Sequence, residues 1–181
     1  MATNAVNVGK GQASGMFFTA AAGTALPTTL SSIPAAWTEV GFISEDGMDL
    51  QLSRDVQDIK DWSNTIRRTI LADHDEKAKG VCISTTAGAL QEIFGTGNVT
   101  ESNGVITVDL SSPDLAAVKA YLFVMKDGDD LMCFGCSNGQ IYVSDNPSFK
   151  AGEAIAWPFE ITAQGTSGMK FIKVTGATGT T

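Results

Sequence analysis

Residues 48–53 read MDLQLS, and in this stretch three apolar residues alternate with three polar ones. A period of two is typical of a β-strand with one buried face, because successive side chains point to opposite sides of a sheet. The next segment, 54–62 (RDVQDIKDW), places five charged residues around Val56, Ile59 and Trp62. It is too mixed for a strand and too short for an independent helix. We therefore expect a loop with apolar anchors over 54–62.

Strand-like segments resume downstream of that loop. Residues 65–71 alternate again, and a further strand is expected at 79–84. Between them lies the charged cluster 73–77, DHDEK. These segments predict a hairpin with a polar tip at 73–77.

One short helix is expected at 87–94. Thr86 can cap its first turn, three apolar residues fall on one face, and Gly95 supplies a stop.

The remaining segments indicate an all-β protein. Residues rich in β-formers predict strands at 14–21, 105–110, 118–126, 131–136, 140–144 and 158–164, with a weaker signal at 170–175. Asn-Gly and Asp-Gly pairs at 103–104, 127–128 and 138–139 are strong turn signals. Residues 116–125 also have helical spacing, but the following turn and partner strand favour β. The fold class is mainly β, an antiparallel β-sandwich or barrel with one short α-helix.

A chain of 181 residues fits one ordinary domain with flexible extras. We expect a flexible N-terminal arm at 1–13, the β-sandwich domain at 14–164 and a C-terminal arm at 165–181. Before Glu39 the only charged residue is Lys10, so this stretch lacks the charge that keeps an exposed tail solvated. It is expected to lie against other protein, with a neighbouring subunit as one candidate.

The composition excludes several classes of function. Twenty acidic against twelve basic residues give a net charge of −8, which repels phosphate and opposes tight nucleic-acid binding. No segment has the pattern of an export signal or a membrane span. The three cysteines match no disulfide framework, and we expect all of them to be thiols.

Candidate catalytic and redox residues are few. His74 is the only histidine, and it falls in the charged cluster without an evident partner for nucleophilic catalysis. Cys133 and Cys136 have the spacing of a zinc knuckle or redox pair, and Cys82 with His74 could complete four ligands. No second pair at ligand spacing exists, so packing within a strand is the preferred interpretation.

Two further motifs are weak. Residues 127–130, DGDD, lack the spaced ligands of a calcium loop, and 9–11, GKG, lack the spacing of a phosphate loop. We therefore expect no catalytic residue, no cofactor and no metal, and a protein that is not an enzyme.

Residues 37–47, WTEVGFISEDG, closely resemble the GYISEDG signature of major tail tube proteins of siphophages, the bacteriophages with long non-contractile tails, notably those of actinobacteria. The likeness continues at 53–55, 58–62 and 66–67, which match the pattern SR, DIKAW and VR, and at 23–27, 90–95, 150–155 and 159–163. The shared order and spacing cover most of residues 15–164. The chain departs from the pattern at 73–79, at 114–140 and at its C-terminus.

The resemblance implies a virion structural protein whose subunits form stacked hexameric rings. Their inner strands would join into a barrel around a lumen that delivers phage DNA into the host cell without binding it specifically, which would also close exposed sheet edges. The implied partners are other copies of the chain, a tape measure protein, and tail tip and tail terminator proteins. Assembly would occur in the host cytoplasm and place the protein in the virion. Other virion β-proteins, such as decoration or adhesion modules, are the alternative class, and a small hydrolase is a distant third.

Two sets of site residues are hypotheses. The charged segment with apolar anchors is expected to make inter-ring contacts, through Glu45, Asp46, Arg54, Asp55, Val56, Asp58, Ile59, Lys60 and Trp62. The carboxylates of Asp49, Asp109 and Glu160 are candidates for a negative lumen wall that lets DNA slide. Solubility alone is the simpler interpretation of the acidic excess.

Overall fold

The computed structural model describes residues 7–11, 16–30, 32–112, 114–166 and 168–175. Its elements in chain order are β1 (Lys10–Gly11), β2 (Phe17–Ala21), β3 (Thr38–Gly41), β4 (Ile43–Lys60), β5 (Ile66–Cys82), α1 (Ala87–Phe94), β6 (Val99–Ser102), β7 (Val105–Val108), β8 (Lys119–Asp127), β9 (Asp130–Val143), β10 (Trp157–Ala163) and β11 (Met169–Val174). All strand pairings are antiparallel. The mainly β fold with one helix is confirmed.

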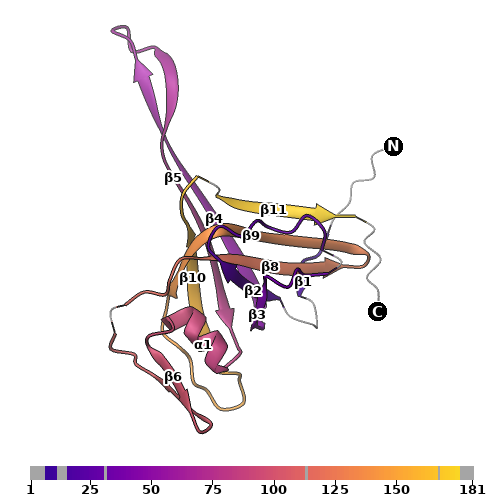
Figure 1. Cartoon of the computed structure of the whole chain (residues 1–181). Helices are drawn as coiled ribbons and strands as arrows, with labels where there is room; N and C mark the ends of the chain where they lie inside the picture. The colour runs from indigo at the N-terminus through magenta and orange to yellow at the C-terminus, as the bar shows by residue number, and fades with distance from the viewer. Residues whose placement is uncertain (1–6, 12–15, 31, 113, 167, 176–181) are drawn as a thin grey trace.

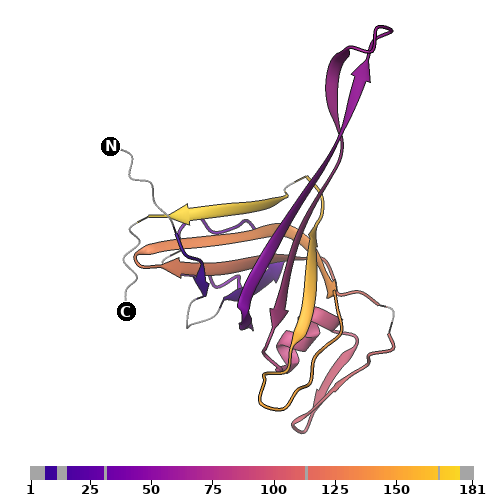
Figure 2. The same ribbon diagram turned by 180° about the vertical axis from the view of Figure 1, so that it is seen from behind.

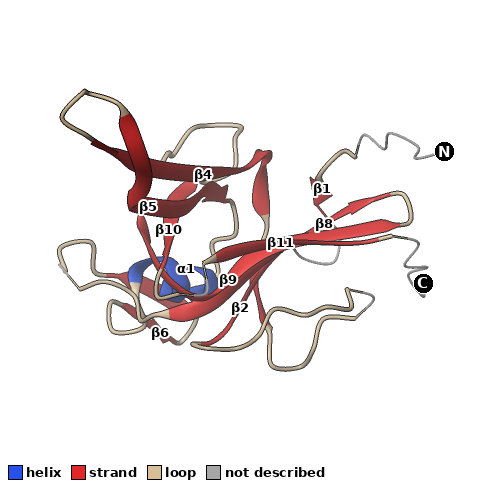
Figure 3. Ribbon diagram, turned by 90° about the horizontal axis from the view of Figure 1, so that it is seen from above, coloured by secondary structure: helices blue, strands red, loops and turns tan. Residues whose placement is uncertain are grey.

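One large sheet bends over on itself at β9 to form two layers. In the first layer β3, β2, β8 and β9 are neighbours, with β1 paired to β8 and β11 paired to the first part of β9. The last part of β9, residues 139–143, pairs with β10. In the second layer β10 pairs in turn with β5, and β5 pairs with β4. Figure 1 shows β4, β5 and β10 running across the direction of β8, β9 and β11. The same crossing is seen from above in Figure 3.

Aromatic rings fill the space between the layers. Phe17, Phe123 and Phe134 come from the first layer, and Phe159 comes from β10 in the second. The ring of Phe17 stacks on Phe123 at 4.7 Å and on Phe159 at 5.2 Å, measured between centroids. Burial of one such side chain stabilises a fold by roughly 1.5–3 kcal/mol. These contacts hold the two layers together.

The other face of the first layer is covered by the chain's own loop between β2 and β3. Leu30 and Trp37 from that loop pack on Leu122, Val124 and other residues of β8 and β9. We expect the nearly uncharged stretch before Glu39 to lie against protein. Within its described residues 17–20 of β2, Leu30 and Trp37 are buried in their own subunit, whereas most of 8–11 and of the β2–β3 loop is exposed.

The helix α1 forms where the sequence predicts it. The Thr86 hydroxyl accepts a hydrogen bond from the Ala89 amide at 3.2 Å, and Gly95 follows the last turn. Glu92 is buried, and it forms an ion pair with Lys119 and accepts a hydrogen bond from the Thr19 hydroxyl. These two contacts tie the helix to β8 and β2.

Two expected turns are correct. Asn103 and Gly104 both have positive φ, at 52° and 78°, and join β6 to β7. Gly128, at φ 58°, joins β8 to β9, and residues 119–127 are a strand and not a helix.

The expected turn at 138–139 is wrong, because β9 is one continuous strand. A Cβ on Gly139 would lie 2.7 Å from the Cys136 sulfur and 2.9 Å from a methyl of Ile161. Glycine is therefore needed at 139 because the Cys136 and Ile161 side chains pack closely over this position, and not because the chain turns there.

The expected loop at 54–62 and the expected hairpin tip at 73–77 are also wrong. β4 runs without a break to Lys60, β5 runs from Ile66 to Cys82, and the turn between them lies at 61–65. Both strands leave the body of the protein, so neither face needs an apolar side to fill a core. The segment 54–62 lacks the alternation of half-buried strands for that reason. The buried face expected at 48–53 is also wrong beyond Met48, because Leu50 and Leu52 are exposed.

The expected arms at 1–13 and 165–181 lie partly outside the described residues. Within those residues, β1 pairs with β8, and β11 pairs with β9 over six residues. Flexibility of the two arms remains a prediction.

Candidate functional site: a projecting hairpin and an apolar groove

The strands β4 and β5 form a long hairpin that projects from the body. They have 18 and 17 residues. Their pairing runs from Ile43 and Cys82 at the base to Lys60 and Ile66 beside the turn. The strand β10 pairs with β5 only over Lys77 to Cys82. Beyond Lys77, no other strand of the described chain pairs with the hairpin. We call residues 50–76 the hairpin arm. At its base the Glu76 carboxylate accepts a hydrogen bond from the Met169 amide of β11, and Figure 1 and Figure 2 show its outer part standing clear of both layers.

The hairpin arm carries apolar side chains on both faces. Val56 pairs with Leu71 and shares a face with it, whereas Ile59 pairs with Arg68 on the opposite face. The exposed apolar side chains of the arm are Leu50, Leu52, Val56, Ile59, Trp62, Ile66 and Leu71. A two-stranded hairpin alone is marginally stable in water, and a large exposed apolar surface marks an interaction site.

The turn at the end of the arm is held by one carboxylate. Asp61 Oδ1 accepts hydrogen bonds from the amides of Ser63 and Thr65, both at 2.9 Å, and from the Ser63 hydroxyl at 2.6 Å. Asp61 Oδ2 accepts from Arg67 Nε at 2.6 Å. The Ser63 hydroxyl, together with these other donors, lowers the pKa of the Asp61 carboxyl. Trp62 is fully exposed at this ordered turn.

The base of the hairpin is an irregular segment. The register shifts between Ile43 and Met48, so the residues between them form a bulge in β4. Gly47 has φ 75°, a left-handed conformation that favours glycine. At the start of the segment the Ser84 hydroxyl accepts a hydrogen bond from the Phe42 amide at 2.9 Å. The sequence FISEDG at 42–47 is thus the link by which the chain leaves β3 and enters the arm.

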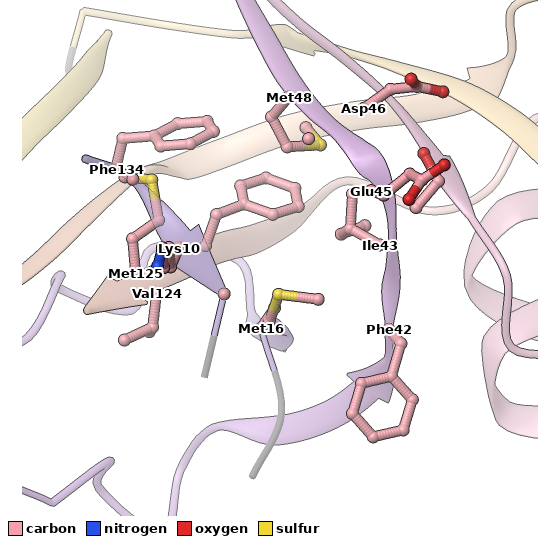
Figure 4. A pocket seen from close by; sticks show the side chains of 15 residues that line it. Lys10, Met16, Phe42, Ile43, Glu45, Asp46, Met48, Val124, Met125 and Phe134 are labelled. Carbon is pink, nitrogen blue, oxygen red and sulfur yellow. The ribbon is translucent and has the colours of Figure 1, made fainter. Parts of the chain in front are cut away.

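An apolar groove of about 760 Å³ lies beside this base. Met16, Met48, Met125 and Phe134 line it, and Phe42 lies at one end. Figure 4 shows the carboxylates of Glu45 and Asp46 at its margin. We call this the base groove.

The expected inter-ring residues fall into two separate places. Glu45 and Asp46 lie in the bulge at the base, whereas Arg54, Asp55, Val56, Asp58, Ile59, Lys60 and Trp62 lie on the arm and its turn. The sequence interpretation missed the other strand of the arm, including Ile66 and Leu71. The apolar residues within 65–71 are the available signal, but the sequence pattern assigns them to a different hairpin.

Two of the expected lumen residues share a surface. Asp49, Lys79 and Glu160 lie in register across β4, β5 and β10, and therefore on one face of the second layer. Asp109 lies away from them, after β7, and accepts hydrogen bonds from Ser111. No pattern in the sequence separates these positions.

Glu160 is only 5% exposed and its charge is compensated. Lys79 Nζ lies 3.0 Å and Lys77 Nζ 3.4 Å from its carboxylate oxygens, and the Tyr142 hydroxyl donates to it. Burial raises the pKa of Glu160, but the Tyr142 hydroxyl and the two ammonium groups outweigh burial and lower that pKa. This carboxylate stabilises the sheet and offers little free charge.

The residues considered for metal or redox chemistry are not assembled into a site. Cys133 and Cys136 are three apart in β9, so they lie on opposite faces and belong to different cores. Burial raises the pKa of each thiol to about 11. Asp127 is occupied as an acceptor for the Val8 amide at 2.9 Å. The described residues contain no cluster of three potential metal ligands.

In the described part of the chain, no helix is long and apolar enough to span a membrane. The search of curated proteins gave no match.

The model of a protein family described as phage tail tube protein matches residues 1–176. That span includes the bulge, the hairpin arm and both sheet layers. Since the match covers nearly all of the 181 residues, the chain belongs to the phage tail tube proteins, which are structural components of the virion tail.

Proposed function

We propose that this protein polymerises as stacked hexameric rings to build the tube through which phage DNA is delivered, with the hairpin arm as its main contact between subunits. The single observation that supports this most is the arm itself, an ordered hairpin with exposed apolar side chains on both faces. Burial against other copies would remove that surface from water.

The free edges of the sheet support the same proposal. β4 is an edge strand of 18 residues. An unpaired edge of that length is a template for pairing with another chain. In a ring each subunit can add its edge to a neighbour, which leaves no edge open.

Within this proposal, inter-ring contacts are made by Arg54, Asp55, Val56, Asp58, Ile59, Lys60 and Trp62, together with Ile66 and Leu71 from the facing strand. Glu45 and Asp46 contribute from the base. Asp49 lies on a polar face of the second layer that could line the lumen, and Asp109 serves a lumen wall only if the β6–β7 end also faces inward.

The other partners follow from family membership. The tube would assemble in the host cytoplasm on a tail tip complex, around a tape measure protein, and end at a terminator. The protein has no catalytic part in this process.

Electron microscopy of the purified protein tests the proposal. The unmodified chain should form tubes or rings with a lumen. A variant in which residues 54–74 are replaced by Asn-Gly joins Ser53 to Asp75, which are paired residues, and keeps the body intact. It should remain folded and monomeric.

Ile106→Ser on the separate β6–β7 hairpin is the matched control and should still assemble. If the shortened variant forms normal tubes, the arm is not the main contact. If the unmodified chain forms no assembly under any condition, the proposed function itself is wrong.

A further inference from the structure

Three tryptophans have very different surroundings in this chain. Trp37 and Trp157 are each 7% exposed, whereas Trp62 is fully exposed at the end of the hairpin arm. The turn that carries Trp62 is fixed by the hydrogen bonds of Asp61. A large aromatic ring on an exposed turn is typical of an anchor residue at an interface.

The base groove has the chemistry to receive such a ring. Its volume of about 760 Å³ lies within the range of ~300–1,000 Å³ typical of ligand pockets. Met16, Met48 and Met125 line it. Thioether side chains adapt their shape and make favourable contacts with aromatic rings. The absence of a side chain on Gly80 leaves the space that the end of Met48 occupies.

Trp62 cannot enter the base groove of its own subunit. Met48 and Trp62 are 14 positions apart along β4 and the start of its turn, which is on the order of 45 Å at about 3.3 Å per residue. Any groove that Trp62 fills must therefore belong to another molecule.

The charges around the two surfaces are complementary. The segment 58–68 carries three basic and two acidic residues, although the whole chain has a net charge of −8. Lys60 and Arg68 are exposed there. Glu45 and Asp46 are exposed at the margin of the base groove, and Lys10 also lines it, so the acidic residues are in excess there. Opposite charges at the rim favour correct orientation during association.

We propose that the turn of one subunit's hairpin arm docks into the base groove of a second copy, with the indole of Trp62 between Met16, Phe42, Met48 and Met125. This inference rests on the proposed function and adds the receptor surface for the arm. Because the projection and the groove are different surfaces, the contact is heterologous and can repeat from subunit to subunit. Such a contact generates rings or filaments.

Photo-crosslinking tests the contact directly. The probe is p-benzoylphenylalanine in place of Trp62, which keeps an aromatic ring at the turn. This variant is mixed with isotopically labelled unmodified protein, assembled, irradiated and analysed by mass spectrometry. Crosslinks between copies should map to Met16, to 42–48 or to 124–125. The same probe at Val105, an exposed residue on β7, is the control and should not label the groove.

Tryptophan fluorescence gives an independent readout. Since the other two indoles are already buried, a blue shift of emission on assembly reports burial of Trp62. Trp62→Ala should raise the concentration needed for assembly at least tenfold, and Val105→Ala should leave it unchanged.

The outcomes separate the two proposals. Tubes that form with crosslinks elsewhere, or without a fluorescence shift, overturn the docking contact and leave the proposed function standing. A chain that never assembles contradicts the proposed function and with it the contact.

Discussion

Single glycines decide how closely the strands of this fold approach each other. A Cβ on Gly135 would overlap the backbone oxygen of Tyr121 in the neighbouring strand. Gly88 in α1 has nothing within 4 Å of the same position. The same substitution should therefore have opposite effects at the two sites.

We expect Gly135→Ala to lower the free energy of unfolding by about 3 kcal/mol, because the backbone of β8 must move. Gly88→Ala should raise it by roughly 0.5–1 kcal/mol, since glycine weakens a helix. Urea denaturation of both variants measures the difference. Equal effects of the two substitutions would contradict the packing described for β8 and β9.

The ionised Asp61 carboxylate makes the stability of the turn of the arm depend on pH. Its pKa is lowered in the folded state, so its stabilising contribution is fully present above the ordinary aspartate value of 3.8. The contribution is lost as the pH falls through the lower folded pKa. An NMR titration should give a midpoint below 3.8 for this carboxyl.

Ser63→Ala should move that midpoint of Asp61 upward, because the Ser63 hydroxyl is the largest cause of the lowered pKa. The Thr65 and Arg67 donors remain in this variant. An unchanged midpoint would show that the hydroxyl contact is not formed in solution.

At the scale of elements, the helix α1 depends on the capping hydrogen bond at its first turn. Thr86 caps α1, and Thr86→Ala should cost about 1 kcal/mol of stability. Thr86→Ser keeps the hydroxyl and should retain most of that stability. Thermal unfolding of the two variants checks the difference, and equal losses would mean that the methyl group matters and not the cap.

The hairpin arm should exchange its amide hydrogens quickly in the monomer, because two strands without a core open readily. The strands β8 and β9 should exchange slowly under the same conditions. On assembly the amides of 50–76 should become protected. Protection that is already high in the monomer would mean that the arm is stable without partners.

The sequence predicts elements best where one face is buried, although the segments 50–53 and 66–71 of the exposed arm are also strands as predicted. Pro158 to Gln164 alternates because Phe159 and Ile161 fill the core, and the strand β10 lies there. In the arm both faces are exposed in the subunit, so the sequence pattern predicts a loop after Ser53, where β4 in fact continues to Lys60. The inter-ring candidates Val56, Ile59 and Trp62 could be selected as apolar residues in a charged segment. Only the structure shows that Val56 pairs with Leu71 and that Ile59 pairs with Arg68.

The base groove could not be predicted from the sequence. Met16, Phe42 and Met125 come from separate segments of the chain, and no spacing brings them together. The signature at 42–47 marked the region through resemblance, without indicating that its bulge borders a groove.

For the molecule as a whole, the acidic excess is divided between surfaces of different kinds. Glu160 is neutralised by Lys77 and Lys79, so its charge serves stability. Asp49 is exposed on the same face. A lumen wall with a net negative charge would therefore depend more on Asp49 than on Glu160.

Virions carrying Asp49→Lys should eject DNA more slowly if that face lines the lumen, because the Debye length of ~8 Å leaves charge at the wall only partly screened. Asp109→Lys is the comparison on a surface remote from Asp49. Unaltered ejection by both variants would leave solubility as the better explanation of the acidic residues.

The arrangement of sulfur in this protein also makes it suitable for chemical labelling. All three cysteines are buried free thiols, and burial raises the pKa of each, so very little thiolate is present at neutral pH. A maleimide dye should leave the folded chain unlabelled and react fully after denaturation. A single cysteine introduced at Val105 would then be the one reactive thiol on each folded subunit. Dyes attached to it would be spaced along a tube at the repeat distance of the subunits.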